Sequence, residues 1–212
     1  MVVELRPRFA PDRRGLLAWS LVWLACVVLC WAFVDRPFAT FSHDVLHRPA
    51  WCVWLTWLAV PPDKLAVAAL VGAFLWRVTG RHFDLAWRTT LAMAWATLFA
   101  TVAVVLLKYA CGREWPETWV EHNPSWISNH AFAFLPFHGG AGYGSFPSGH
   151  TARVTAPFAV LWHRLPRWRV LWVLPTLLVT VGLLGANFHF PSDCIAGAGL
   201  GVVCALLALR FF

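Results

Sequence analysis

His189 and Asp193 stand four residues apart, just ahead of the last long apolar run of the chain. A carboxylate at that reach accepts a hydrogen bond from one imidazole nitrogen, which sets the tautomer and leaves the other nitrogen free to attack an electrophile. The alternative is that Asp193 only caps the helix that follows. Because an ionisable residue beside a membrane span is by default functional, we interpret the pair as a nucleophile and its orienting carboxylate.

The string Pro147-Ser148-Gly149-His150 has the composition of a helix start that faces an anion. Proline suits the first helical turn, where its missing N–H costs nothing, and serine is a common N-cap. The backbone amides of Ser148, Gly149 and His150 could then bind an anion with the help of the helix dipole. Taken alone, the string is equally compatible with an ordinary helix start.

Three basic residues near these motifs could neutralise a bound phosphate. Lys108 offers a point charge and Arg113 a planar fork, although a lysine at the end of a span is also typical of snorkelling. Arg153 follows His150 by three residues and lies on nearly the same helix face. An arginine inside a span needs a polar partner, which is either a bound phosphate or a buried group such as Asn187.

The composition is that of a membrane protein. The chain has 212 residues, of which 59% are hydrophobic and 13% charged, whereas soluble domains carry about 25% charged residues. Its 15 tryptophans suit the bilayer interface. The formal charge of +7 comes from basic residues between apolar runs, so membrane topology explains it and no nucleic-acid partner is expected. We expect one all-α domain over residues 1–212.

Six apolar segments are candidates for membrane spans, with a four-span arrangement as the alternative because two of them are short. They cover residues 16–34, 64–79, 86–108, 148–162, 168–187 and 192–211. With six spans, most basic residues outside the spans, including Arg6 and Arg8, fall on one side, which favours six spans and cytoplasmic termini. The first run resembles a signal peptide but is long and lacks a cleavage site, so it is interpreted as an uncleaved span.

Two segments remain on the outer side, and the six-span arrangement places all three polar motifs there as well. Residues 35–63 contain spaced tryptophans and predict an interfacial helix. Residues 109–147 form a long loop of the kind that is usually functional, and its irregularly spaced histidines predict no metal site. A disulfide between Cys111 and Cys194 is left open, because sequence does not establish its geometry.

Together, the three motifs resemble the type 2 phosphatidic acid phosphatase (PAP2) family of lipid phosphate phosphatases. The family pattern is a lysine with Arg-Pro seven residues on, then Pro-Ser-Gly-His, then Ser-Arg followed by a histidine and, four residues later, an aspartate. The resemblance covers roughly residues 100–200. It implies a membrane phosphatase without metal or other cofactor that hydrolyses a lipid phosphomonoester or diphosphate through a phosphohistidine.

The resemblance also implies roles for individual residues. His189 is the expected nucleophile, Asp193 its orienting group and His150 the acid that protonates the leaving group. Lys108, Ser148 and Gly149 are expected to hold phosphate oxygens, because they occupy the matching positions of the family pattern.

Two family arginines are missing from this chain. The position of the first is Trp115, beside which Arg113 is the expected substitute. The Ser-Arg pair of the third motif falls on Gly182 and Leu183, and we expect Arg153 to replace that arginine.

Several functional alternatives stay open at this stage. Candidate substrates are undecaprenyl diphosphate, phosphatidylglycerol phosphate, phosphatidic acid and lipid A phosphates. The other possibilities are a phosphotransferase and a non-catalytic lipid-binding or transport protein on the same fold. The missing arginines favour the non-catalytic protein, whereas the intact His150, His189 and Asp193 argue against it. We expect a multi-pass protein of the bacterial inner membrane, surrounded by membrane lipids, with its site facing the periplasm. No motif encodes the head group or the oligomeric state.

Overall fold

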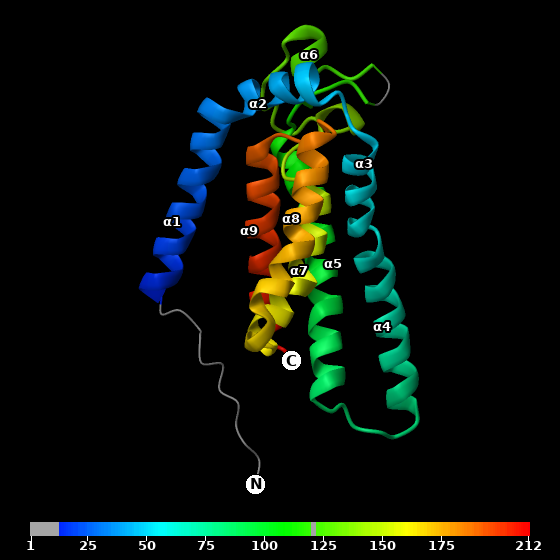
Figure 1. Ribbon diagram of the computed structural model, residues 1–212. Coiled ribbons are helices and arrows are strands. Elements are labelled where there is room, and N and C mark those ends of the chain that lie inside the picture. Colours follow the sequence, from blue (N-terminus) through cyan, green and yellow to red (C-terminus); the bar gives the residue numbers. More distant parts are fainter. Residues whose placement is uncertain (1–12, 120–121) are drawn as a thin grey trace.

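Long apolar helices dominate the computed structural model, which describes residues 13–119 and 122–212 (Figure 1). Arg6 and Arg8 lie outside the described residues. The helices are α1 (Arg13–Leu29), α2 (Asp35–Phe41), α3 (Ala50–Thr56), α4 (Pro61–Val78), α5 (Leu85–Cys111), α6 (Trp126–Asn129), α7 (Gly149–Arg164), α8 (Arg169–Gly185) and α9 (Pro191–Ala208). Short π-helical turns (Cys30–Val34, Ser42–Leu46) and 3-10 turns (Trp57–Ala59, Ala141–Tyr143, Pro166–Trp168) join several of them.

Within the described residues, five helical segments are long and apolar enough to cross a membrane. They are Arg14–Leu46, Ala50–Val78, Leu85–Cys111, Pro166–Gly185 and Pro191–Ala208. The remaining expected span corresponds to α7, a helix of 16 residues whose first turn carries polar side chains. It packs against α5, α8 and α9 and so occupies the middle of the bundle.

The segment expected to lie along the membrane surface takes a different course. Helix α2 and the turn after it run across the top of the bundle, but α3 turns downward and leads directly into α4 (Figure 1). The reason is that α3 buries Cys52 and Thr56 against α8, while its tryptophans point outward. Contact is close because Gly182 and Gly185 of α8 leave room for the α3 backbone and the Cys52 side chain.

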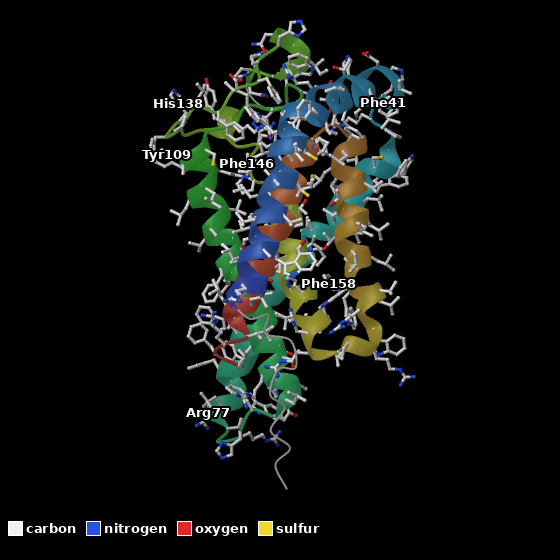
Figure 2. The ribbon with its side chains drawn as sticks, turned by 90° about the vertical axis from the view of Figure 1, so that its left-hand side faces the viewer. Phe41, Arg77, Tyr109, His138, Phe146 and Phe158 are labelled. Carbon is white, nitrogen blue, oxygen red and sulfur yellow. The ribbon has the colours of Figure 1, made fainter. Side chains whose placement is uncertain are left out.

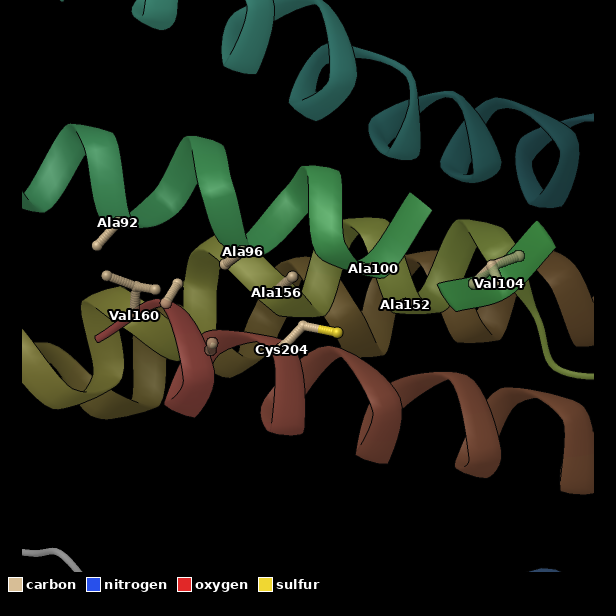
Figure 3. Close-up of a cluster of buried hydrophobic side chains, with 10 residues drawn as sticks. Ala92, Ala96, Ala100, Val104, Ala152, Ala156, Val160 and Cys204 are labelled. Atoms are coloured by element: carbon tan, nitrogen blue, oxygen red, sulfur yellow. The ribbon is translucent and has the colours of Figure 1, made fainter. Parts of the chain in front are cut away.

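Small side chains let α5, α7 and α9 pack closely around the centre of the bundle (Figure 3). Alanine dominates this core, which allows the backbones to approach as glycine and alanine do in membrane helix pairs. The buried members are Ala92, Ala96, Ala100, Val104, Ala152, Ala156, Val160, Cys204, Ala205 and Ala208. This three-helix core carries the N-terminal ends of α7 and α9 and the C-terminal end of α5 to one end of the molecule.

The two ends of the bundle differ in what they hold. Arg77, near the end of α4, lies at one end. Tyr109, near the end of α5, and His138, in the loop before α7, lie at the other (Figure 2). The C-terminus and the turn between α4 and α5 share the Arg77 end (Figure 1). The three polar motifs of the sequence therefore meet at the end covered by residues 112–119 and 122–148.

Gly201 supplies a test of this packing. A Cβ at this position would lie 2.7 Å from the carbonyl oxygen of Ala152 and 2.7 Å from Cβ of Thr155. We expect Gly201→Ala to destabilise the protein by about 1–3 kcal/mol, because α7 and α9 must separate. Thermal unfolding in detergent measures this. Gly72→Ala is the control, since the nearest atom there is at 3.5 Å; equal melting temperatures for the two variants would contradict the packing argument.

Candidate active site

A pocket of about 510 Å³ opens at the loop-covered end of the three-helix core. Its walls come from α3, α5, α7 and the segments that follow α5 and α8. The lining residues are Thr56, Thr101, Val104, Val105, Lys108, Trp115, Trp119, Gly149, His150, Arg153, Phe188 and His189. Four of the side chains singled out from the sequence, namely Lys108, His150, Arg153 and His189, thus share one cavity, together with the backbone of Gly149.

His189 and Asp193 meet at the back of this pocket. Asp193 is in the first turn of α9, and its Oδ2 lies 3.4 Å from Nδ1 of His189. The same carboxylate oxygen accepts hydrogen bonds from the Ser145 hydroxyl at 2.6 Å and the Phe190 amide at 3.0 Å. An ionised Asp193 accepts a hydrogen bond from Nδ1–H of His189, so Nε2 is the nitrogen with a free lone pair.

The electrostatic surroundings keep His189 neutral. Burial lowers the pKa of His189, and the hydrogen bond and charge of Asp193 oppose that shift, while the positive charge of Lys108 adds to it. A neutral imidazole whose proton is held at Nδ1 is a nucleophile at Nε2. The His189 ring is only 3% exposed, so a reactant must enter the pocket to reach it.

Arg113 lies behind the pocket rather than in it. Its side chain is 1% exposed and forms ion pairs with both Asp193 and Asp35, the latter at 2.6 Å. It also donates to the Ser192 hydroxyl at 2.7 Å. Four aromatic rings surround the guanidinium: Phe132, Phe134, Phe146 and Phe190. The expectation that Arg113 contacts a phosphate does not match this position, since two carboxylates already occupy its fork.

Asp35 is a participant that the sequence reasoning missed. It stands at the end of the first apolar run, where we expected only the beginning of a surface segment. A carboxylate directly after a span was a usable signal, because ionisable residues at such places commonly have a role.

Two of the three residues expected to bind an anion at the N-terminal end of α7 line the pocket. Ser148 caps the helix, and its hydroxyl accepts hydrogen bonds from the amide and hydroxyl of Thr151. Its own amide donates to the carbonyl oxygen of Asp193 at 3.0 Å, and the residue is fully buried. Ser148 thus joins α7 to α9, contrary to the expectation of an anion contact. Gly149 and His150 remain at the pocket, in a turn whose amides lack intrahelical partners.

Two cationic side chains converge on Gly149. A Cβ at this glycine would lie 3.8 Å from Nη2 of Arg153 and 3.9 Å from Cε of Lys108. Arg153 donates from Nε to the Gly149 carbonyl oxygen and from Nη1 to Oδ2 of Asp63, at 3.0 and 2.7 Å. Asp63 is therefore its protein partner, in place of the Asn187 considered from sequence.

The second histidine of the pocket lies opposite the first. The ring centres of His150 and His189 are 6.4 Å apart and the ring planes are inclined by 62°. The space between them is bordered by Lys108, Arg153 and the first turn of α7. Two imidazole rings and two cationic side chains thus line one pocket that suits a phosphoryl group.

An aromatic wall completes the pocket on the loop side. Trp115, at the position of a family arginine, has its ring centre 5.2 Å from that of His189 and donates from its indole to the Ala141 carbonyl oxygen at 2.7 Å. Trp119 packs edge-on against Phe188, with ring centres 4.8 Å apart. Bulky aromatic groups here replace charge with a flat apolar surface.

The cysteines flanking the motifs are not joined. Cys111 and Cys194 are both free thiols, and Cys194 is buried beneath the site. Cys194 packs in a hydrophobic cluster with Val154, Val179 and Leu183, as is typical of cysteine as a small hydrophobic residue.

Comparisons with known proteins point in one direction. The sequence profile of the PAP2 superfamily matches residues 89–212, which is more than half of the chain. The lipid A 1-phosphatase of Rhizobium johnstonii is 33% identical over 115 residues, covering 54% of this chain and 44% of that protein. The lipid A 1-phosphatase of Rhizobium etli is 36% identical over 110 residues, covering 52% and 44%. The matched region is thus less than half the length of either relative. No solved structure matches the chain.

Gly149 tests whether the pocket binds an oxyanion. An alanine methyl group would lie 3.2 Å from Cγ1 of Val104 and intrude between the two cations. We expect Gly149→Ala to weaken the binding of orthovanadate about tenfold, or about 1.4 kcal/mol. Calorimetric titration of the detergent-solubilised protein measures the affinity. Gly139→Ala is the control, since its nearest neighbour would be at 3.8 Å; equal affinities in both variants would rule out this cradle.

Proposed function

Because the chain belongs to the PAP2 superfamily, we propose that it hydrolyses the phosphate of a membrane lipid through a phosphohistidine formed at His189. The observation that carries the proposal is the placement of His189, backed by Asp193, across a single pocket from His150. Lipid binding alone requires neither the second histidine nor a carboxylate behind the first. Both relatives bear the name of lipid phosphatases, which supports the same reaction class.

In the first step, Nε2 of His189 attacks the phosphorus atom. A P–N bond forms while the bond between phosphorus and the lipid oxygen breaks. The cationic ring of His150 donates its proton to the departing oxygen, so the lipid leaves as an alcohol. The positive charge that appears on the His189 ring is stabilised by Asp193 through the Nδ1 proton.

In the second step, His150 acts as the base. Its neutral ring takes a proton from a water molecule, whose oxygen attacks phosphorus as the P–N bond breaks. Inorganic phosphate leaves, His189 is again neutral at Nε2, and His150 is again protonated. Microscopic reversibility requires this exchange of roles for a residue that served as acid in the first step.

The negative charge of the phosphoryl group is neutralised by the chain itself. Lys108 and Arg153 border the reacting position, and the amides of Gly149 and His150 point along the dipole of α7. In this role Arg153 substitutes for the family arginine that falls on Leu183. The proposed reaction therefore proceeds without a metal ion.

Among substrates, we favour a lipid A 1-phosphate. Two relatives carry that activity in their names, and the flat wall of Trp115, Trp119 and Phe188 beside His189 suits a ring-shaped head group better than a small linear one. Undecaprenyl diphosphate, phosphatidylglycerol phosphate and phosphatidic acid are the competing substrates.

We place the pocket on the periplasmic side of a bacterial inner membrane, in a single domain. In this arrangement α7 is a span in addition to the five long apolar segments. The short length of α7 is compatible with this because its polar first turn meets the loop region rather than lipid. The opposite end holds Arg77 and Arg81 near the end of α4, and Arg164 and Arg167 around the end of α7, as the positive-inside rule requires of a cytoplasmic end.

Phosphate release from defined lipids tests the proposed function. The purified protein in EDTA is given lipid A bearing a 1-phosphate, phosphatidic acid, phosphatidylglycerol phosphate and undecaprenyl diphosphate. We expect release to be fastest from lipid A and His189→Ala to abolish it, because no other group supplies the nucleophile. His138→Ala, at an exposed loop histidine, is the control. Absence of release from every lipid would favour a binding protein, and dependence on a divalent ion would refute the metal-free chemistry.

Arg153 gives a second, independent test. We expect Arg153→Ala to lower kcat for phosphate release by about 100-fold, the usual cost of losing one group that stabilises transition-state charge. Because the guanidinium is partly exposed, with 28% of the side chain accessible, the fold should persist, as checked by thermal unfolding. Arg81→Ala, at the opposite end of the bundle, is the matched control. Unchanged kcat in Arg153→Ala would remove this residue from the phosphate cradle.

A further inference from the structure

Asp35 is a buried carboxylate that the reaction scheme leaves unused. It begins α2, is 0% exposed, and accepts hydrogen bonds from Nη2 of Arg113 at 2.6 Å and from the Ser192 amide at 2.9 Å. The Ser192 hydroxyl donates to it as well. Burying a carboxylate costs several kcal/mol unless its partners are well placed, so this arrangement is too complete to be incidental.

The guanidinium of Arg113 is divided between two carboxylates. Nη1 faces Oδ1 of Asp193, whereas Nη2 faces Oδ2 of Asp35. A guanidinium that faced Asp193 alone could place both nitrogens on it and hold its charge more completely. Counting both carboxylates as ionised, the buried group of three has one net negative charge, since one guanidinium balances only one of them. The titratable ring next to that charge is His189, through Oδ2 of Asp193.

We propose that Asp35 is a positioning residue of the active centre: by holding half of Arg113, it leaves Asp193 enough negative charge to stabilise the cationic form of the His189 ring. This inference rests on the proposed function for its catalytic consequence. The first helical segment of the chain, through Asp35 in its middle, thereby acts on His189 without touching it.

In the proposed reaction, positive charge develops on the His189 ring only during the attack. His189 is neutral before attack and becomes a cation as the P–N bond forms. A net charge of −1 behind it is then cancelled in the transition state, whereas a neutral Arg113–Asp193 pair would offer weaker compensation. Because these side chains are buried close together, one unit charge among them changes the energy of the cationic ring more than it would in bulk water.

The other charged groups facing His189 are cationic or become so. Lys108 approaches from α5, and His150 and Arg153 approach from α7. Each of them disfavours a positive charge on the nucleophile. Asp193 on α9 is the carboxylate in contact with His189, so its residual charge decides how far these cations are offset.

Titration of His189 by NMR measures this coupling without any substrate. The imidazole nitrogens are labelled, and the His189 signal is assigned as the one that is missing in His189→Gln. Three variants then change the net charge of the buried group of three. Asp35→Asn makes it neutral, Arg113→Gln makes it −2, and the double variant returns it to −1. We expect the His189 midpoint to fall by about one pH unit in Asp35→Asn, to rise in Arg113→Gln, and to return towards the wild-type value in the double variant.

Activity and stability complete the design. We expect kcat to fall about tenfold in Asp35→Asn and to recover in part in Asp35→Glu, which restores the charge. Asp44→Asn is the matched control, an exposed aspartate nine residues further along the same helical segment. If Asp35→Asn unfolds, the double variant is compared with Arg113→Gln instead. Both of these variants lack the arginine, and they differ only in the charge at position 35.

The outcomes separate this inference from the proposed function. Midpoints that follow the net charge support the role of Asp35, and midpoints that are equal in all folded variants overturn it. A purely structural role would lower the folded fraction and leave the midpoint where it is. If the midpoints follow the charge but the wild-type protein releases no phosphate from any lipid, the proposed function fails while the charge coupling stands.

Discussion

A single buried guanidinium joins three parts of this protein that are far apart in sequence. Arg113 follows α5, Asp35 ends the first apolar run, and Asp193 opens α9; their ion pairs meet in a space lined by phenylalanine rings. Breaking such a group by removing one partner typically costs several kcal/mol, because an uncompensated charge is left in an apolar interior. Together with the hydrogen bonds from Ser145 and the Phe190 amide, the ion pair with Arg113 sets the orientation of Asp193, which contacts His189.

Close helix packing is the second constraint, and it sets where the phosphate cradle lies. A Cβ at Gly197 of α9 would stand 2.4 Å from the Ser148 carbonyl oxygen, so only glycine allows the start of α7 to rest against α9. The Ser148 amide then reaches the carbonyl oxygen of Asp193. His189, on the loop before α9, and the first turn of α7 are thereby held in fixed positions relative to each other, as the catalysis that we propose requires.

The departures from the family pattern have a consistent physical meaning. The site of the first family arginine is taken by Trp115, and the guanidinium nearby faces inward to two carboxylates. Positive charge in the pocket comes instead from Lys108 and Arg153, the latter steadied by Asp63. Charge on one wall has been exchanged for an aromatic surface, which in our proposal shifts the selection of substrate and leaves the reaction class intact.

Sequence alone determined the class of the protein and the pairing of His189 with Asp193. Apolar runs indicated a helical membrane protein because a bilayer demands them, and local spacing paired His189 with Asp193 because four residues span one helical turn. The roles of Arg113, Ser148 and Asp35 were decided only by tertiary structure. A side chain's spacing from a motif says nothing about the direction in which it points once the chain has left the helix. Arg113 turned inward because carboxylates from two distant segments met there, and no local pattern in the sequence records that meeting.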